Sequence, residues 1–461
     1  MPLLDVDYVV VGAGAAGMAF TDALLDHADV RVALVDRRPS PGGHWRDAYP
    51  FVRLHQSSSF YGVASTVLGG YRVQQDGPEA GLHQRATGAE VCAYYDQVLT
   101  DRLLASGRVE WLAGWDYLGD RRVRSLRSDE ERTLPERCRV VDARFLAPEI
   151  PSLTPPPFDV AEGAQVHPVN DLVDLTDPAR PYVIVGSGKT ATDAVVWLLT
   201  HGVDPARVSW VRPRDPWMLN RAVVQPVPEV FLGMVATVLQ QAASCRSLDE
   251  LFRQLEDAGV MLRIDPAVTP TMARAPTLGR WELDLLREVE HVVRRGHVRR
   301  VEPGRVTFDD GTLAVPADAL VVHCAASGLQ TPAPVPVWSA AGITLQPIRA
   351  GFPCFGAALI GYVEATRDSD EDKNRLCPPS SYGDSLAQWA RMTVLGARAS
   401  ATFGTEPDIS DWANGVALNP ARIPAGYGTS VALDDARERL QKHTRPGLAR
   451  LADLSGLPAA L

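Results

Sequence analysis

Short continuous runs of apolar residues alternate along this chain with stretches whose apolar residues recur at helical spacing. Residues 8–11 and 30–35 have the length of buried parallel strands, and residues 16–25 between them have the length of a helix. The same strand–helix–strand order returns at residues 182–185, 192–199 and 208–211. The pattern therefore predicts an α/β protein in which one structural unit occurs twice.

Each unit is followed by similar elements. Alternating apolar and polar residues predict a small β-meander in the region 109–141 and another at 298–313, and each leads into a further strand, at 139–143 and 319–323. An internal duplication explains this repeated order more simply than coincidence.

Two regions lie outside the repeat. Residues 226–286 have mostly helical spacing and are too long for a crossover connection, so we predict a helical insertion at about 222–290 over the cofactor cleft. The tail is predicted to contain an apolar run at 357–363, an acidic and basic loop at 368–375, and helices near 385–399 and 433–454.

A glycine-rich turn joins the first strand to the first helix. Gly12 permits a tight turn, Gly14 lets the backbone approach a pyrophosphate, and Gly17 lets the helix pack close to the strand. The helix N-terminus, from Ala15 onward, offers unpaired N–H groups to phosphates. Asp36 ends the next strand about 20 residues further on, where a carboxylate accepts hydrogen bonds from ribose hydroxyls. Together these features predict a dinucleotide site.

The second unit has a related turn, formed by Gly186, Ser187, Gly188, Lys189, Thr190 and Ala191. Alanine at the third glycine position still permits close packing. Its next strand is followed by Arg212 and Arg214 instead of an acid. A guanidinium can hold a 2′-phosphate with two hydrogen bonds, whereas a carboxylate would repel it. We therefore predict NADPH rather than NADH here, with plain surface charge as the alternative role of the arginines.

Composition narrows the function classes. The formal net charge of -10 disfavours nucleic-acid binding, which needs concentrated positive charge. The N-terminus lacks a signal-peptide pattern and no apolar run is long enough for a bilayer, so we expect a cytoplasmic protein without a membrane contact. The six cysteines have neither metal-ligand nor C-x-x-C spacing, which predicts no metal site and no redox dithiol.

The two turns together resemble those of the two-dinucleotide flavoproteins, and in particular the class B monooxygenases: the flavin-containing, N-hydroxylating and Baeyer–Villiger enzymes. A G-G-x-W element at residues 42–45 and the pair Tyr49 and Pro50 belong to the same resemblance. The resemblance implies FAD in the first unit and NADPH in the second. Beyond the two turns, Asp36 and Arg212, the implied cofactor-binding residues are Arg37, Gly43, His44, Trp45 and Ser327.

The resemblance also implies the fold. We expect two Rossmann-like dinucleotide-binding domains, each with a small β-meander, plus the helical insertion. The FAD-binding domain is predicted to comprise residues 1–165 and 321–461, and the NADPH-binding domain residues 166–320.

One departure from the family lies between the predicted domains. The fingerprint F-x-G-x-x-x-H followed by an aromatic residue is only partly present. Gly163 and His167 keep their spacing, but Phe158 lies too far upstream and Asp171 replaces the aromatic residue. His167 is therefore as compatible with a plain loop histidine as with the role that the family gives it.

A second departure concerns the catalytic centre. Where flavin-containing monooxygenases carry an Asn after Y-P, this chain has His55 followed by Gln56. These two residues are our candidates for the hydrogen-bond donors beside the reactive flavin ring. An altered residue at this position is also compatible with a loss of oxygenation.

The predicted function is an NADPH-consuming FAD monooxygenase that transfers oxygen from O2 to a small molecule, with oxygenation at nitrogen placed ahead of sulfoxidation or Baeyer–Villiger oxidation. A NAD(P)H:acceptor flavoprotein reductase without oxygen transfer is the second enzymatic alternative. A flavin or nucleotide sensor is the non-enzymatic one. The expected partners are O2 and the small-molecule substrate, and a homo-oligomer is left open.

Overall fold

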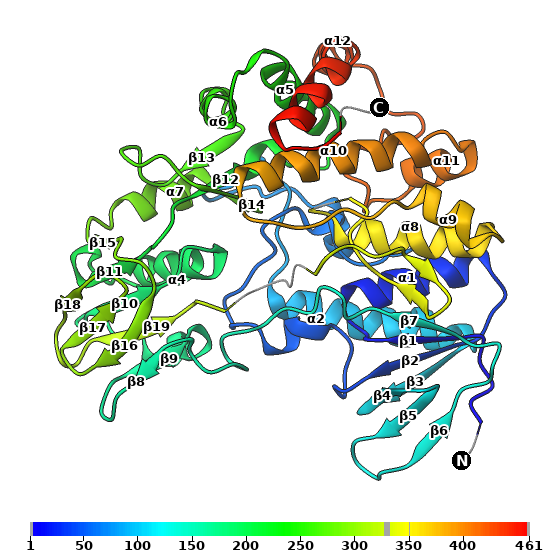
Figure 1. Cartoon of the computed structure of the whole chain (residues 1–461), viewed down its shortest axis with the longest axis horizontal. Coiled ribbons are helices and arrows are strands. Elements are labelled where there is room, and N and C mark those ends of the chain that lie inside the picture. The colour runs from blue at the N-terminus through cyan, green and yellow to red at the C-terminus, as the bar shows by residue number, and fades with distance from the viewer. Residues whose placement is uncertain (1–2, 327–331, 350, 459–461) are drawn as a thin grey trace.

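The computed structural model describes residues 3–326, 332–349 and 351–458, which form two β-rich units beneath a layer of helices (Figure 1). The first unit is built on a six-stranded sheet. Its strand order is β20 (Trp338–Ser339), β21 (Gly342–Thr344), β7 (Arg139–Asp142), β1 (Tyr8–Val11), β2 (Val32–Asp36) and β3 (Val109–Ala113). Helix α1 (Ala15–His27) follows β1 directly, as the pattern of apolar residues predicts.

Helix α8 (Pro353–Thr366) packs closely against α1. A Cβ atom added at Gly361 would lie 2.6 Å from the carbonyl oxygen of Phe20, so glycine allows this approach. The helix is buried on nearly all sides, which explains why its apolar run shows no helical period. The remaining small elements of this unit are α2 (Gly88–Gln97) and the antiparallel strands β4 (Trp115–Gly119), β5 (Arg122–Ser125) and β6 (Glu131–Thr133).

The second unit repeats this plan. Its sheet has the order β15 (Val292–Val293), β11 (Val208–Val211), β10 (Tyr182–Val185), β19 (Leu320–His323) and β9 (Val166–Pro168), and α4 (Lys189–Thr200) follows β10. The predicted second meander is present as β16 (Val298–Glu302), β17 (Arg305–Phe308) and β18 (Thr312–Ala314), with β8 (Asp159–Val160) added beside β16. Strands β7 and β19 occupy equivalent places, since each pairs in parallel with the first strand of its unit.

The insertion, for which the sequence predicts mostly helical structure, also contains strands. It contains α5 (Pro228–Ser244), α6 (Leu248–Asp257) and α7 (Arg280–Arg287). It also contains β13 (Met261–Arg263) and β14 (Met272–Leu278), which pair with β12 (Pro216–Asn220) in a three-stranded sheet. These strands pair with a distant segment, so local apolar spacing does not reveal them.

The C-terminal helices complete the upper layer in Figure 1. They are α9 (Asp370–Leu376), α10 (Leu386–Phe403), α11 (Pro407–Gly415) and α12 (Val431–Leu454). Helix α12 lies against α5, and a side chain at Gly447 would overlap the carbonyl oxygen of Leu239. The tail therefore packs on the insertion as well as on the first unit, and β19 lies in the sheet of the second unit.

The prediction of an acidic and basic loop at 368–375 was wrong, because residues 370–375 belong to α9. Lys373 is buried in this helix, and its Nζ lies 2.7 Å from Glu364 Oε2. Asn374 accepts from the backbone N–H of Trp338, and Arg375 pairs with Asp372 and Glu406. The cluster therefore stabilises the fold.

Candidate functional site

The first glycine turn brings three backbone segments into close contact. Gly12 has a φ of 107°, which favours glycine, and a Cβ atom at Gly17 would overlap the Gly12 carbonyl oxygen. A Cβ atom at Gly43 would lie 3.0 Å from the Cα of Gly14. Gly14 caps α1 without a side-chain hydrogen bond, so Ala15 begins a helix whose first N–H groups are open to an anion.

Asp36 stabilises this turn. Its Oδ2 accepts a hydrogen bond of 2.7 Å from the backbone N–H of Ala13, and its Oδ1 accepts one of 2.8 Å from Arg38. A carboxylate has about four acceptor sites, so two remain for ribose hydroxyls. The neighbouring Arg37 is exposed and pairs with Asp116 at 2.6 Å.

The G-G-x-W segment lies beside the turn. The ring of His44 stacks on that of Trp45 at a centroid distance of 5.4 Å, and the Trp45 indole N–H donates to the hydroxyl of Tyr61 at 2.7 Å. Burial, helped by the charge of Arg38, lowers the pKa of His44 to about 4. His44 is therefore neutral at physiological pH.

The second turn is built in the same way. Gly186 has a φ of 141°, and Gly188 caps α4 without a side-chain hydrogen bond. The predicted binding residues Ser187 and Thr190 are partly exposed on this turn, whereas Ala191 is buried. The backbone of the turn is therefore available to a phosphate.

Lys189 has a different environment from that of a free phosphate-binding lysine. Its Nζ lies 2.5 Å from Asp193 and 3.1 Å from Glu282. Burial alone would lower the pKa of its ammonium, but these two carboxylates outweigh burial and raise it. Glu282 also pairs with Arg85 at 3.3 Å, so Lys189 joins a buried ionic network that connects the two units.

The Arg212 guanidinium is buried and stacks over the Trp210 ring at 4.6 Å. Its Nη2 lies 2.8 Å from Asp215, while its Nε and Nη1 are buried without a hydrogen-bond partner among the described residues. Burial lowers the pKa of Arg212 to about 10, so it keeps its charge at neutral pH. Arg214 is half-exposed and pairs with Asp384 at 2.9 Å.

Residues 43–56 connect both turns. From Gly43, beside Gly14, this segment reaches Tyr49, whose hydroxyl donates to Asp193 of α4 at 2.7 Å. It continues to His55 and Gln56, where the Gln56 side-chain amide donates to the carbonyl of Gly351 at 3.0 Å. The segment that begins beside the first turn therefore contacts α4 of the second unit and then the loop before α8.

His55 lies at the junction of the units. Its backbone carbonyl accepts from the hydroxyl of Thr277, and its Nδ1 is buried without a partner among the described residues. Burial, together with the charges of Lys189 and Arg85, lowers the pKa of His55 to about 3. The imidazole is therefore neutral and one nitrogen is free to bond a ligand.

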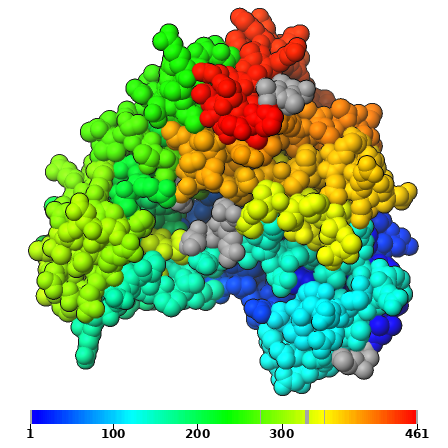
Figure 2. Space-filling model, viewed as in Figure 1, coloured from blue at the N-terminus to red at the C-terminus, as the bar shows by residue number. Residues whose placement is uncertain are grey.

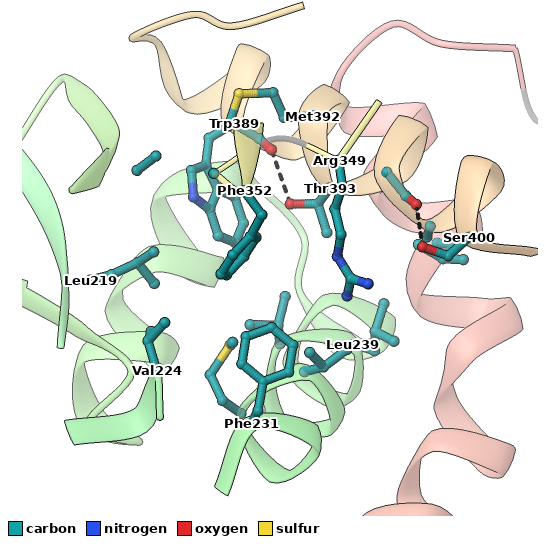
Figure 3. Close-up of a pocket in the computed structure, with 18 of the residues that line it drawn as sticks. Leu219, Val224, Phe231, Leu239, Arg349, Phe352, Trp389, Met392, Thr393 and Ser400 are labelled. Atoms are coloured by element: carbon teal, nitrogen blue, oxygen red, sulfur yellow. Dashed lines mark hydrogen bonds between the residues drawn. The ribbon is translucent and has the colours of Figure 1, made fainter. Parts of the chain in front are cut away.

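Gln56 lines a cavity of about 330 Å³ between α5, α10, α12 and the loop before α8 (Figure 3). Most of its lining is apolar, including Phe231, Phe352 and Trp389. Arg349 projects into this space in Figure 3, above the ring of Phe231. Sequence reasoning missed Arg349 and most of the lining, because these residues come together from segments far apart in the chain.

These residues fit two dinucleotides. The first turn has no room for a side chain at Gly17, Gly186 of the second turn has a positive φ, and each helix begins without a side-chain cap. The free donors on Arg212 and the free acceptor sites on Asp36 give the two turns opposite charge preferences. Figure 2 shows that the surface is hollowed between the blue and cyan part of the first unit and the second unit, in green and yellow-green. Ser327, a predicted cofactor-binding residue, lies outside the described residues.

Comparison with known proteins gives the fold and the family. The NAD(P)-binding Rossmann-like domain model matches residues 10–57. The uncharacterized protein Rv2000 of Mycobacterium tuberculosis is 41% identical over 419 residues, which are 90% of this chain and 78% of the relative. A ferredoxin–NADP reductase of Salinispora tropica is 29% identical over 228 residues, which are 48% of this chain and 59% of that protein.

Among solved structures, a mutant cyclohexanone monooxygenase from Rhodococcus sp. Phi1 bound to NADP⁺ has a TM-score of 0.51 at 17% identity, over 88% of this chain and 98% of that one. This likeness confirms the predicted two-dinucleotide flavoprotein fold. Within the part of the chain that the structure describes, no helix is long and apolar enough to cross a membrane.

Proposed function

This chain belongs to the family of the mycobacterial protein Rv2000 and has the fold of class B flavin monooxygenases, and from this premise we propose that it is an FAD-dependent, NADPH-oxidising monooxygenase. One observation carries the proposal. The segment that begins at Gly43 beside the first turn contacts Asp193 of the second helix through Tyr49 and ends at Gln56 on the cavity. Two cofactors and a substrate could thus meet along one stretch of chain.

In this proposal the first turn, with Asp36, holds FAD, and the second turn, with Arg212, holds NADPH. When bound, reduced FAD supplies the electrons that activate O2. The protein's own groups bind the cofactors and the substrate and shield the reaction from water. Gln56 places an amide on the cavity, the neighbouring His55 has a buried ring nitrogen without a partner among the described residues, and the apolar side chains around the cavity exclude water.

Oxygenation at nitrogen remains our first assignment. None of the described residues that line the cavity is Asp or Glu, and most of the lining is apolar. An apolar environment disfavours an ammonium, so an amine bound here would keep its lone pair free for oxidation. The cyclohexanone monooxygenase named above makes ketone oxidation the second assignment.

A flavoprotein reductase is the competing function, and the ferredoxin–NADP reductase of Salinispora tropica is the observation that favours it. The apolar cavity favours the monooxygenase, since electron transfer to a protein needs no enclosed site for a small molecule.

The deciding experiment follows the oxygen atom. Purified holoprotein is incubated with NADPH, isotopically labelled O2 and a panel of amines, sulfides and ketones, and the product masses are measured. We expect NADPH oxidation that a substrate stimulates and one labelled oxygen atom in the product. NADPH oxidation with ferredoxin or a quinone as acceptor, and no labelled product with any panel member, would support the reductase instead.

A further inference from the structure

Arg349 is a cation without an acidic partner. Its Nη1 donates to Asn419 Oδ1 at 3.2 Å, and its guanidinium carbon lies 5.9 Å from the centre of the Phe231 ring. Across residues 3–326, 332–349 and 351–458, no carboxylate forms an ion pair with it. A guanidinium has five N–H donors, so most of its capacity is unused.

Each of the four buried lysine and arginine side chains that the structure describes faces a carboxylate. Lys373 lies 2.7 Å from Glu364, Arg85 lies 2.8 Å from Glu79, and Arg212 lies 2.8 Å from Asp215. Arg221 also faces Glu79, at 3.6 Å. Burying a charge without a partner is strongly unfavourable, so Arg349 differs from the general plan of this molecule.

Burial alone lowers the pKa of Arg349 to about 10, and no neighbouring charge opposes or adds to that effect. The side chain is therefore still protonated at neutral pH. A cavity that encloses a protonated guanidinium has a positive potential, which an anion would neutralise.

The hydroxyls that line the cavity have already used their donors. Thr393, Ser400 and Thr444 each donate to a carbonyl of their own helix, at 3.0, 2.9 and 2.6 Å. The side-chain amide of Gln56 uses one of its two N–H groups on Gly351. Arg349 is the charged group among the described lining residues, and the remaining lining is mostly apolar.

We propose that this cavity binds an apolar carboxylic acid, with the carboxylate held by Arg349 and the hydrocarbon body packed between α5, α10 and α12. The substrate class of the enzyme is then an apolar acid that carries the oxidisable centre. This assignment as substrate rests on the proposed function, whereas the binding of the acid does not. A guanidinium matches a carboxylate in shape and in charge, and the apolar walls favour a hydrocarbon chain or ring.

The test compares an acid with its neutral amide. Isothermal titration of the holoprotein uses phenylbutyrate and phenylbutyramide, and then shorter and longer phenylalkanoate pairs. We expect the acid of the best-fitting pair to bind about ten- to hundredfold more tightly than its amide. In Arg349→Met, the acid should lose that advantage while the amide binds as before, and Arg349→Lys should retain part of it.

Arg422→Met is the matched control. Arg422 also faces an aromatic ring and donates a hydrogen bond, at 5.1 Å from the Tyr71 ring and 2.6 Å from its hydroxyl, but it does not line the cavity. Its replacement should leave both affinities unchanged. If Arg349→Met does not fold, the acid-to-amide ratio of the unaltered protein decides the question.

Equal affinities for acid and amide, or no acid binding with any pair, would overturn the proposal. The flavin spectrum and NADPH oxidation are recorded on the same preparation. A yellow protein that oxidises NADPH but binds no acid would reject this inference and leave the proposed function standing. Acid binding to a protein without flavin would support this inference and reject the proposed function.

Discussion

The two glycine turns share an equivalent backbone hydrogen bond and have opposite charges beside them. Gly12 N–H donates to Val35 O at 2.8 Å, and Gly186 N–H donates to Val211 O at 3.0 Å. The next residues, Asp36 and Arg212, are therefore structural equivalents. One scaffold, used twice, carries a carboxylate in the first unit and a guanidinium in the second.

The two side chains are also anchored differently. Asp36 bonds directly to the first turn through the Ala13 N–H. Arg212 reaches the second turn indirectly, because it stacks on Trp210, whose indole N–H donates to the Gly186 carbonyl at 2.8 Å. The residue at the end of the second strand of each unit is thus linked to its turn. Under the proposed function it also selects the dinucleotide.

The largest effect is expected at the third glycine position. Gly17→Ala would place a methyl group on the Gly12 carbonyl oxygen, whereas Ala191 at the equivalent place already carries one. We expect Gly17→Ala to lower the free energy of unfolding by about 3 kcal/mol and to abolish flavin retention. Ala191→Gly should lower it by about 1 kcal/mol. Urea unfolding measures both, and equal losses would contradict the difference in packing between the two turns.

Asp36→Ala should have the next largest effect. It removes the acceptor of the Ala13 N–H and the predicted partner of the ribose, so the flavin-to-protein ratio after purification should fall severalfold while the protein remains folded. Asp204→Ala is the control, because Asp204 also accepts a backbone N–H bond, at 2.9 Å from Ala206, but lies far from the first turn in sequence. An unchanged ratio in Asp36→Ala would remove this residue from the FAD site.

Arg212→Ala should weaken the binding of NADPH roughly ten- to hundredfold and leave the binding of NADH almost unchanged, because only NADPH carries a 2′-phosphate. The apparent KM values for both nucleotides measure the effect. Arg214→Ala shows whether the second arginine shares the role, and Arg207→Ala, at the other end of β11, serves as the control. Equal losses for NADPH and NADH would assign Arg212 to folding alone.

The smallest effect concerns His55. Because burial and the nearby cations lower its pKa to about 3, the ring stays neutral as the pH rises or falls through 6.5, the ordinary value for histidine. The pH profile of kcat/KM should therefore show no inflection near 6.5 that belongs to His55. Profiles of the unaltered protein and of His55→Asn measure this, and an inflection there that the variant loses would contradict the buried, neutral ring.

The repeated βαβ units could be predicted from the sequence because their signals are local. Strand length, glycine spacing and the residue after the strand lie within about 20 residues of one another, and the family resemblance added the cofactors. The structure confirms the two units and their meanders. The cofactor and catalytic roles of individual residues stay predictions.

What the sequence did not reveal depends on distant contacts. Lys373 lies in a charged stretch that is typical of a solvated loop, but its buried ammonium pairs with Glu364 of α8. The strands of the insertion pair with β12, and Arg349 lines a cavity that α5, α10 and α12 form around it. Local pattern contains no information on such partners.

An anaerobic NADPH titration of the purified protein tests whether the two units hold different dinucleotides that exchange electrons. We expect a yellow protein whose flavin absorption band is bleached by about one equivalent of NADPH. We also expect Arg212→Ala to need far more NADPH for the same change. A protein purified without flavin, or a flavin band that NADPH leaves unchanged, would show that the two units do not work in this way.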